Sequence, residues 1–244
     1  MESEMRDVYD ELRQRNIPVE LFTDKRLHRR QLPVSKDTLV VGYVETMYTV
    51  FKLLGIHPPS PNDYPSILQP LFYRRIWNSS LQDLMNSVME SGIPIFAKPS
   101  EQKKLFTGQV FKHSADLNNT DNAPMTTPIF CSEVVDWLSE YRVFVIHGNI
   151  VGARHYDGDP AVKIDERVAT EAVRLLEKSE DATAAYAIDL GVISTGQTAL
   201  IEWNDGFSLG SYGLDRWVYT GLLIARWNEL TGCTNEVKHD PSTI

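Results

Sequence analysis

Ile201-Glu202-Trp203-Asn204-Asp205-Gly206 and the earlier stretch Tyr186-Ala187-Ile188-Asp189-Leu190-Gly191 decide the fold of this chain. Alternate residues of a strand face the same side, so Glu202 and Asn204 converge, and Asp189 meets them from a neighbouring strand. Carboxylate and amide oxygens are ligands that hard cations such as Mg²⁺ prefer, with water and phosphate oxygens completing the shell. The pattern predicts a metal site at the strand ends. The alternative is a plain hairpin turn at residues 204–206.

Composition and charge narrow the class of protein. The 244 residues are 42% hydrophobic, enough to bury a core in one large domain or two small ones. A net charge of -9 argues against binding to nucleic acid or anionic membrane, since both favour a basic surface. No apolar run approaches the roughly 20 residues of a membrane helix, and we expect a cytoplasmic protein. Cys131 and Cys233 are expected to be free thiols.

The first third of the sequence predicts a small α/β unit. Residues 5–15 and 44–54 have the apolar spacing of helices, and Gly55 is placed to cap the second. Residues 19–22 and 38–43 have the composition of strands. Four prolines between residues 58 and 65 favour a loop and a boundary nearby. We therefore expect an N-terminal unit at 1–72 and a second domain at 73–244.

The second domain predicts mixed helices and strands. Helical spacing covers residues 73–90 and 163–178. A hairpin is expected around His147-Gly148-Asn149, a turn sequence that tolerates positive φ. The other predicted strands are 95–97, 110–111, 129–135, 184–192 and 198–203.

Lys98 is the first candidate for binding an anion. It closes the apolar strand 95–97, where a lysine is well placed to act as a point charge on a phosphate. The loop at 100–108, with Lys104, is a candidate cover for phosphates, although it contains one glycine. The alternative for Lys98 is a solvated strand terminus.

A second group of candidates surrounds the predicted hairpin. The extended segment that includes Glu133, Val134 and Val135 offers backbone groups to an adenine edge, and Glu140 offers an acceptor to ribose hydroxyls. The two hairpin arms carry Arg142 and Arg154, whose planar guanidinium groups suit bidentate binding of carboxylate or phosphate. The alternative is a surface salt bridge between Glu140 and Arg142, which would contribute little stability.

Read in order, the segments IPIFAKPS (93–100), CSEVVDWLSEYRVFVIHGNIVGARHY (131–156), YAIDLGV (186–192) and IEWNDGFSLGSYG (201–213) resemble the ATP-grasp superfamily. The chain is similar to small bacterial and phage domains of that superfamily, most of them without an assigned substrate. The resemblance extends upstream through residues 37–55 and 61–77. It implies an α+β fold in which two α+β subdomains clasp ATP, preceded by the small α/β unit.

The resemblance also implies roles for individual residues. Lys98 matches the lysine on the α and β phosphates, and residues 133–136 match the hinge that binds adenine, chiefly through Val134 and Val135. Glu140 matches the ribose-binding acid. The basic residues near the γ-phosphate and the acyl phosphate are matched by Arg142 and Arg154, and the magnesium ligands by Asp189, Glu202 and Asn204.

Two positions depart from the family pattern. An earlier lysine of the family is replaced where Arg74-Arg75 stands, and we take Arg75 as its substitute. The phosphate-covering loop that contains Lys104 lacks the usual run of small residues, which leaves the closure of the site open.

The implied activity is that of an ATP-dependent carboxylate–amine ligase that works through an acyl phosphate and uses ATP and Mg²⁺. Its partners would be a small-molecule or peptide carboxylate and an amine. The alternatives are a nucleotide-binding sensor without ligase turnover and an ATP-dependent phosphotransferase. Apolar residues near the C-terminus belong either to the core or to a homodimer interface: Trp217, Tyr219, Leu222 and Trp227.

Overall fold

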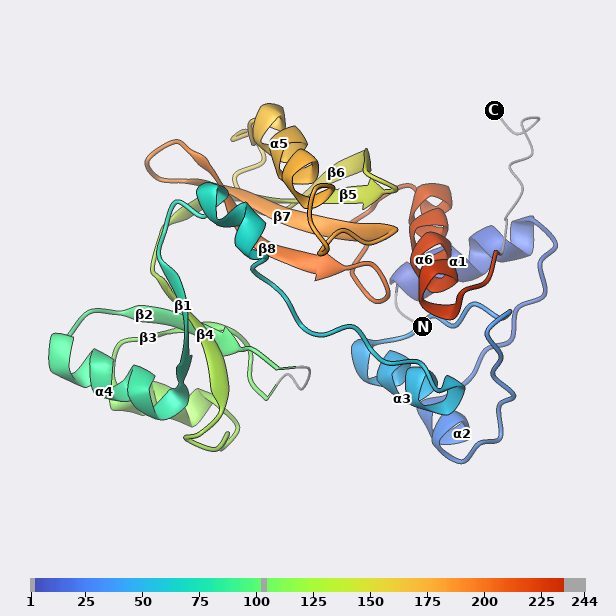
Figure 1. Cartoon of the computed structure of the whole chain (residues 1–244), viewed down its shortest axis with the longest axis horizontal. Helices are drawn as coiled ribbons and strands as arrows, with labels where there is room; N and C mark the ends of the chain where they lie inside the picture. The colour runs from blue at the N-terminus through green and yellow to red at the C-terminus, as the bar shows by residue number, and fades with distance from the viewer. Residues whose placement is uncertain (1–2, 102–104, 235–244) are drawn as a thin grey trace.

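The computed structural model of the protein describes residues 3–101 and 105–234. Within them, two four-stranded sheets form the frame, in the orders β1-β4-β2-β3 and β6-β5-β7-β8 (Figure 1). Every pairing in both sheets is antiparallel. The first sheet contains β1 (Ile76–Ser80), β2 (Ile95–Pro99), β3 (Gln109–Phe111) and β4 (Pro128–Glu133). The second contains β5 (Trp137–Ile146), β6 (Asn149–Gly158), β7 (Ala185–Ile193) and β8 (Thr198–Asp205).

The first sheet is covered by α4 (Leu81–Ser91), whose apolar side chains pack on β2, β3 and β4. The Ser80 hydroxyl accepts a hydrogen bond from the Asp83 backbone N–H at 3.1 Å, and this cap begins the helix. The predicted helix at 73–90 is therefore wrong in its first part. Residues 76–80 instead pair with β4, because their backbone groups find partners there that an isolated helix start lacks. A short 3₁₀ helix, η2 (Ser114–Asn119), follows β3.

Cys131 lies in this first core and is 1% exposed. Burial raises the pKa of its thiol to about 12, so the thiolate is scarce at neutral pH. We expect Cys131 to resist a thiol-specific disulfide reagent in the folded protein and to react after denaturation, whereas the less buried Cys233 reacts first. Counting reacted thiols with and without denaturant tests this, with Cys233→Ser as the control. Equal rates for both thiols in the native protein would contradict it.

The second sheet has a helix on each of its two faces. Alternate residues of β5 and β7, such as Val143 and Ile188, pack against α5 (Glu166–Leu176). Their neighbours, such as Phe144 and Ala187, pack against α6 (Arg216–Thr231). This explains why every residue of β7 is buried. The predicted hairpin is confirmed, with His147 and Gly148 both at positive φ in its turn.

The N-terminal segment contains α1 (Ser3–Gln14), α2 (Asp24–His28) and α3 (Val44–Leu54), which ends at Gly55 with φ of 67° as predicted. The strands predicted at 19–22 and 38–43 are wrong, since no strand precedes residue 76 among the described residues. Residues 39–41 are extended, but they pack their side chains into cores beside α6 and α3 instead of pairing in a sheet.

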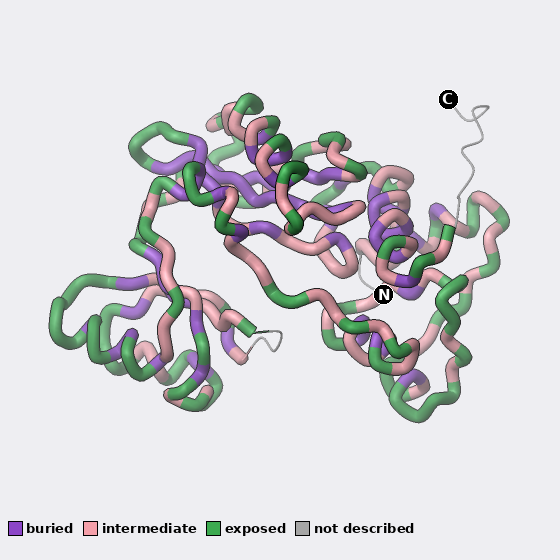
Figure 2. Tube along the Cα trace, in the orientation of Figure 1, coloured by how far each residue is buried: buried purple, intermediate pink, exposed green. Residues whose placement is uncertain are grey.

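The N-terminal helices share their cores with α6. Trp227 packs with residues of α3, while Tyr219 and Leu222 pack with Val8 of α1. Trp217 is half-buried, and the Arg15 guanidinium lies 2.9 Å from its ring centre. These aromatic residues therefore belong to the core in large part, and a homodimer stays a prediction. Figure 2 shows the buried positions concentrated in β5, β7 and α6.

From α3 the chain runs as an irregular linker, residues 55–65, to the 3₁₀ helix η1 (Ser66–Leu71) beside β8 (Figure 1). The Trp203 backbone N–H of β8 donates to the Asp63 carbonyl at 2.8 Å, which fixes the linker to the edge of the second sheet. Asn62 adds a side-chain hydrogen bond to Asp181 at 2.7 Å. None of the described helices has the length and apolar character needed to cross a membrane.

Candidate functional site

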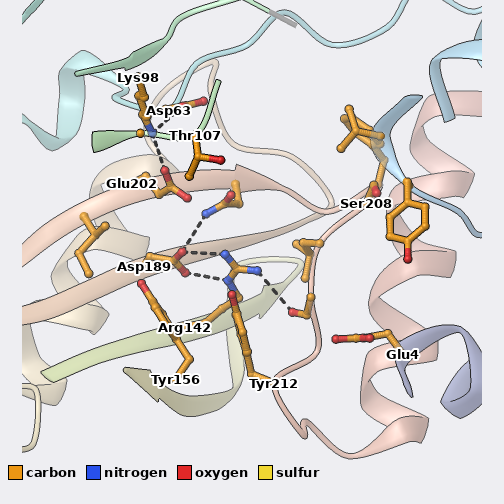
Figure 3. A pocket seen from close by; sticks show the side chains of 18 of the residues that line it. Glu4, Asp63, Lys98, Thr107, Arg142, Tyr156, Asp189, Glu202, Ser208 and Tyr212 are labelled. Carbon is orange, nitrogen blue, oxygen red and sulfur yellow. Dashed lines mark hydrogen bonds and ion pairs between the residues drawn. The ribbon is translucent and has the colours of Figure 1, made fainter. Parts of the chain in front are cut away.

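A cavity of about 980 Å³ is lined by residues from both sheets, the linker, α1, α6 and the loop after β8 (Figure 3). Lys98 of β2 and Asp63 of the linker lie at one end, and Glu4 lies at the other. Between them lie the side chains of β5, β7 and β8. The strand ends that the sequence singled out therefore face one shared space.

Carboxylates outnumber cations around this cavity. Among the described residues that line it, eight are acidic and two are basic. The acidic residues are Glu4, Glu45, Asp63, Glu101, Glu140, Asp157, Asp189 and Glu202, and the basic ones are Lys98 and Arg142. A polyanion entering this space meets net repulsion unless cations enter with it.

The three residues predicted to bind a metal are brought together. Asp189 of β7 lies directly opposite Glu202 of β8 in the sheet register. The Asn204 side-chain amide donates to Asp189 Oδ2 at 3.2 Å. Two carboxylates and one amide form a donor set that suits Mg²⁺, because this ion takes few protein ligands and completes its shell with water and phosphate. No larger cluster of His, Cys, Asp and Glu suited to a metal occurs in the described part of the chain.

Arg142 and Asp189 form a buried two-point ion pair. Arg142 Nε and Nη2 donate to Asp189 Oδ1 and Oδ2 at 2.8 and 2.7 Å. Burial raises the pKa of the Asp189 carboxyl, and the Arg142 guanidinium opposes that shift. The planar fork of arginine matches both carboxylate oxygens, so each buried charge has a full partner.

Lys98 contacts two carboxylates at the other end of the cavity. Its ammonium lies 2.6 Å from Asp63 Oδ2 and also pairs with Glu202 Oε2. The Tyr64 ring centre is 4.7 Å from the same ammonium. Burial lowers the pKa of Lys98, but Glu202, Tyr64 and Asp63 together raise it above its ordinary value, so the amine stays charged. Burial also raises the pKa of Glu202, and Lys98 outweighs this to lower it.

Asp63 and Tyr64 are site residues that the sequence analysis missed. They lie in the proline-rich segment that was interpreted only as a boundary loop. The available signal was an acidic and an aromatic residue flanked by prolines at 61 and 65. Repeated prolines stiffen a loop, and stiff loops can hold a side chain in one place.

Glu140 lies in the middle of the cavity beside two stacked tyrosines. The rings of Tyr156 and Tyr212 are 4.8 Å apart and nearly parallel, and Arg142 lies 4.8 Å from the Tyr212 ring centre. Burial raises the pKa of Glu140, while hydrogen bonding with Tyr156 lowers it. The predicted surface salt bridge between Glu140 and Arg142 does not form, because Arg142 binds Asp189 instead.

Two predicted basic residues do not line this cavity. Arg154 lies opposite Arg142 in the sheet, yet its guanidinium donates to the carbonyls of Gly213 and Ala153 at 3.0 and 2.9 Å. Arg75 is exposed and lies over the Trp77 ring. Neighbouring Arg74 contacts the site more closely, since it donates to the Ile201 carbonyl at 3.1 Å. The roles predicted for Arg75 and Arg154 stay predictions.

The predicted hinge is placed between the two sheets. Residues 134–136 lead directly from β4 into β5, as a hinge requires. The Glu133 carboxylate accepts from the Arg75 backbone N–H at 2.9 Å. Val134 and Val135 line a smaller hollow of about 290 Å³ rather than the large cavity. Lys104 lies outside the described residues.

A family model decides what this arrangement is. The model describes an ATP-grasp domain, family 2 of its clade, and it matches residues 71–222, which is more than half of the chain. The chain belongs to this ATP-grasp family. The superfamily resemblance and the α+β ATP-grasp fold are thereby confirmed. The match begins at the last residue of η1, so the linker residue Asp63 precedes the ATP-grasp domain as the family model defines it.

Solved structures support the ATP-grasp fold. An ADP complex of purK, an N5-carboxyaminoimidazole ribonucleotide synthetase, is 12% identical with a TM-score of 0.50, covering 69% of this chain and 50% of that one. The N5-carboxyaminoimidazole synthetase from Staphylococcus aureus with ADP gives 14% identity, a TM-score of 0.44 and coverages of 67% and 47%. The ATP-grasp ligase PsnB with precursor peptide PsnA2 and AMPPNP gives 15%, 0.46, and 66% and 56%.

These likenesses cover the ATP-grasp fold rather than whole proteins. The chain spans about half the length of the solved structures that it matches. None of the curated proteins compared with the chain matches it.

Proposed function

We propose that this protein is an ATP-dependent ligase that joins a carboxylate to an amine through an acyl phosphate. The observation that carries the proposal is the convergence of Lys98 with Asp189, Glu202 and Asn204 on one cavity of an ATP-grasp domain. A phosphate-binding cation and a set of oxygen ligands for a metal are what phosphoryl transfer requires.

The chemistry would proceed in two balanced steps. A substrate carboxylate oxygen attacks the γ-phosphorus of ATP, the bond from that phosphorus to the bridging oxygen breaks, and ADP leaves. An amine nitrogen then attacks the acyl carbon, the carbon–oxygen bond to phosphate breaks, and the nitrogen loses a proton. No protein nucleophile is needed, so the side chains act by positioning and by charge.

The chain's own residues divide this work. Lys98 would bind the α and β phosphates, and Glu140 would accept from the ribose hydroxyls. The hinge backbone at Val134 and Val135 would bind adenine, with Arg75, Lys104 and Glu133 as further nucleotide contacts. Asp189, Glu202 and Asn204 would hold Mg²⁺, which neutralises and aligns the phosphates when bound.

Arg142 is the basic residue best placed to act on the transferred phosphate. It lines the cavity, whereas Arg154 binds backbone carbonyls outside it. Arg142 has a further donor, Nη1, in a long contact of 3.4 Å with the Gly210 carbonyl. This weak contact can be exchanged for a phosphate oxygen while the bonds to Asp189 remain.

Product analysis tests the proposal. Purified protein is incubated with Mg²⁺, ATP and pooled amino acids and carboxylic acids, and the products are analysed by mass spectrometry. ADP together with a condensed amide supports the ligase. ADP with a phosphorylated acceptor supports the phosphotransferase, and nucleotide binding without ADP supports a sensor. Either of the last two results would overturn the ligase proposal.

A further inference from the structure

Asp63 lies in the nucleotide end of the cavity but precedes the segment that the family model matches. Its backbone carbonyl is fixed to β8 by the Trp203 N–H, one residue from Glu202. Its carboxylate lies 2.6 Å from the Lys98 ammonium. The linker therefore delivers a charged group to the residue proposed to bind phosphate.

Lys98 is shared between two carboxylates of different origin. The ammonium has three N–H donors, and Asp63 and Glu202 each take one. Two carboxylates and one ammonium leave this group of three with a net charge of -1. Lys98 side-chain exposure is 12%, so solvent screens these charges only in part. Without another cation, a phosphate approaching Lys98 meets a negative group.

Glu202 is also a proposed ligand of Mg²⁺, and this links the two sites. When Glu202 binds a divalent cation, the same group changes from net negative to net positive. Lys98 then keeps Asp63 as its remaining carboxylate partner, and Asp63 holds the ammonium in place beside the incoming phosphates.

We propose that Asp63 is a positioning residue that holds Lys98 against Glu202 and makes nucleotide binding at this site depend on a divalent cation. The inference rests on the proposed nucleotide site and adds a residue and a control to it. A merely structural Asp63 would fix the linker through its backbone carbonyl, which any substitution keeps. The side-chain carboxylate is therefore what the test must address.

The test compares ATP affinity with Mg²⁺ and with a chelator in place of Mg²⁺, by calorimetry on the full chain. In Asp63→Asn, one carboxylate no longer holds Lys98, so metal-free ATP is expected to bind about tenfold more tightly. With Mg²⁺ the lost charge and the lost positioning of Lys98 oppose each other, and affinity changes less. The ratio of the two affinities therefore falls about tenfold.

Three further variants make the outcome specific. Asp63→Glu retains the charge and is expected to restore the original ratio. Asp157→Asn removes an equal charge from the same cavity without contact to Lys98, and it is expected to leave the ratio unchanged. Asp63→Ser is a second neutral variant for the case in which Asp63→Asn fails to fold.

The results separate this inference from the proposed function. An unchanged ratio in the neutral Asp63 variants, or an equal fall in Asp157→Asn, would overturn the inference while the nucleotide site stands. Weaker binding in both conditions would also overturn it, because that outcome indicates a structural role alone. If the unaltered protein binds no ATP even with Mg²⁺, the proposed function itself fails.

Discussion

Glu202→Gln is expected to lower ATP turnover by about a hundredfold or more. Glutamine keeps the shape of the side chain but removes the charge that faces both Lys98 and the proposed metal position. The pKa of Glu202 is held below its ordinary value by Lys98 against the effect of burial, so the carboxylate is ionised at neutral pH. Turnover is measured as ADP released with Mg²⁺ and the pooled substrates, and Asn204→Ala should change it in the same direction.

The control for this variant is Glu171→Gln, which alters an exposed acid paired with Arg174 on α5. Its turnover is expected to equal that of the unaltered protein. Thermal melting of Glu202→Gln shows whether the fold persists. Unchanged ADP release in a folded Glu202→Gln protein would refute the assignment of Glu202 as a metal ligand.

Arg142→Ala is expected to lower the free energy of unfolding by about 3 kcal/mol as well as to abolish turnover. Removing the guanidinium leaves Asp189 with a buried charge, and its side chain is 3% exposed. The remaining hydrogen bond from Asn204 does not neutralise that charge. Chemical denaturation of the two proteins measures the difference.

A double variant separates stability from chemistry. Adding Asp189→Asn to Arg142→Ala removes the unpaired charge, so part of the lost stability should return while turnover does not. Arg142→Lys keeps the positive charge without the two-point geometry and should fall between. If Arg142→Ala stays within about 1 kcal/mol of the unaltered protein, the ion pair does not have the energetic role given to it here.

The metal-site residues could be found from the sequence because their arrangement is local. Glu202 and Asn204 share a strand face by the two-residue period, and Asp189 lies on the next strand of the same sheet. The hairpin at His147 was predictable for a similar reason, since its turn residues and flanking strands are contiguous. Short-range rules suffice where the partners are close in the chain.

Other features depended on contacts that no short-range rule contains. Residues 76–80 form a strand because β4, more than 50 residues away, provides the partner. Residues 38–43 have strand composition but no strand beside them, so they remain irregular. Asp63 reaches Lys98 only because η1 and the linker lie along β8, and that placement is a property of the whole fold.

The shared packing of α1, α3 and α6 has a consequence for how the protein can be divided. The family match ends at residue 222, within α6, and begins after α1 and α3. Phe51 and Trp227 are buried in one cluster, and Val8 and Leu223 are buried in another. A fragment cut to the matched segment would lose partners from both clusters and expose the apolar face of the second sheet to water. The cooperative folding unit is therefore larger than the evolutionary unit that the family describes.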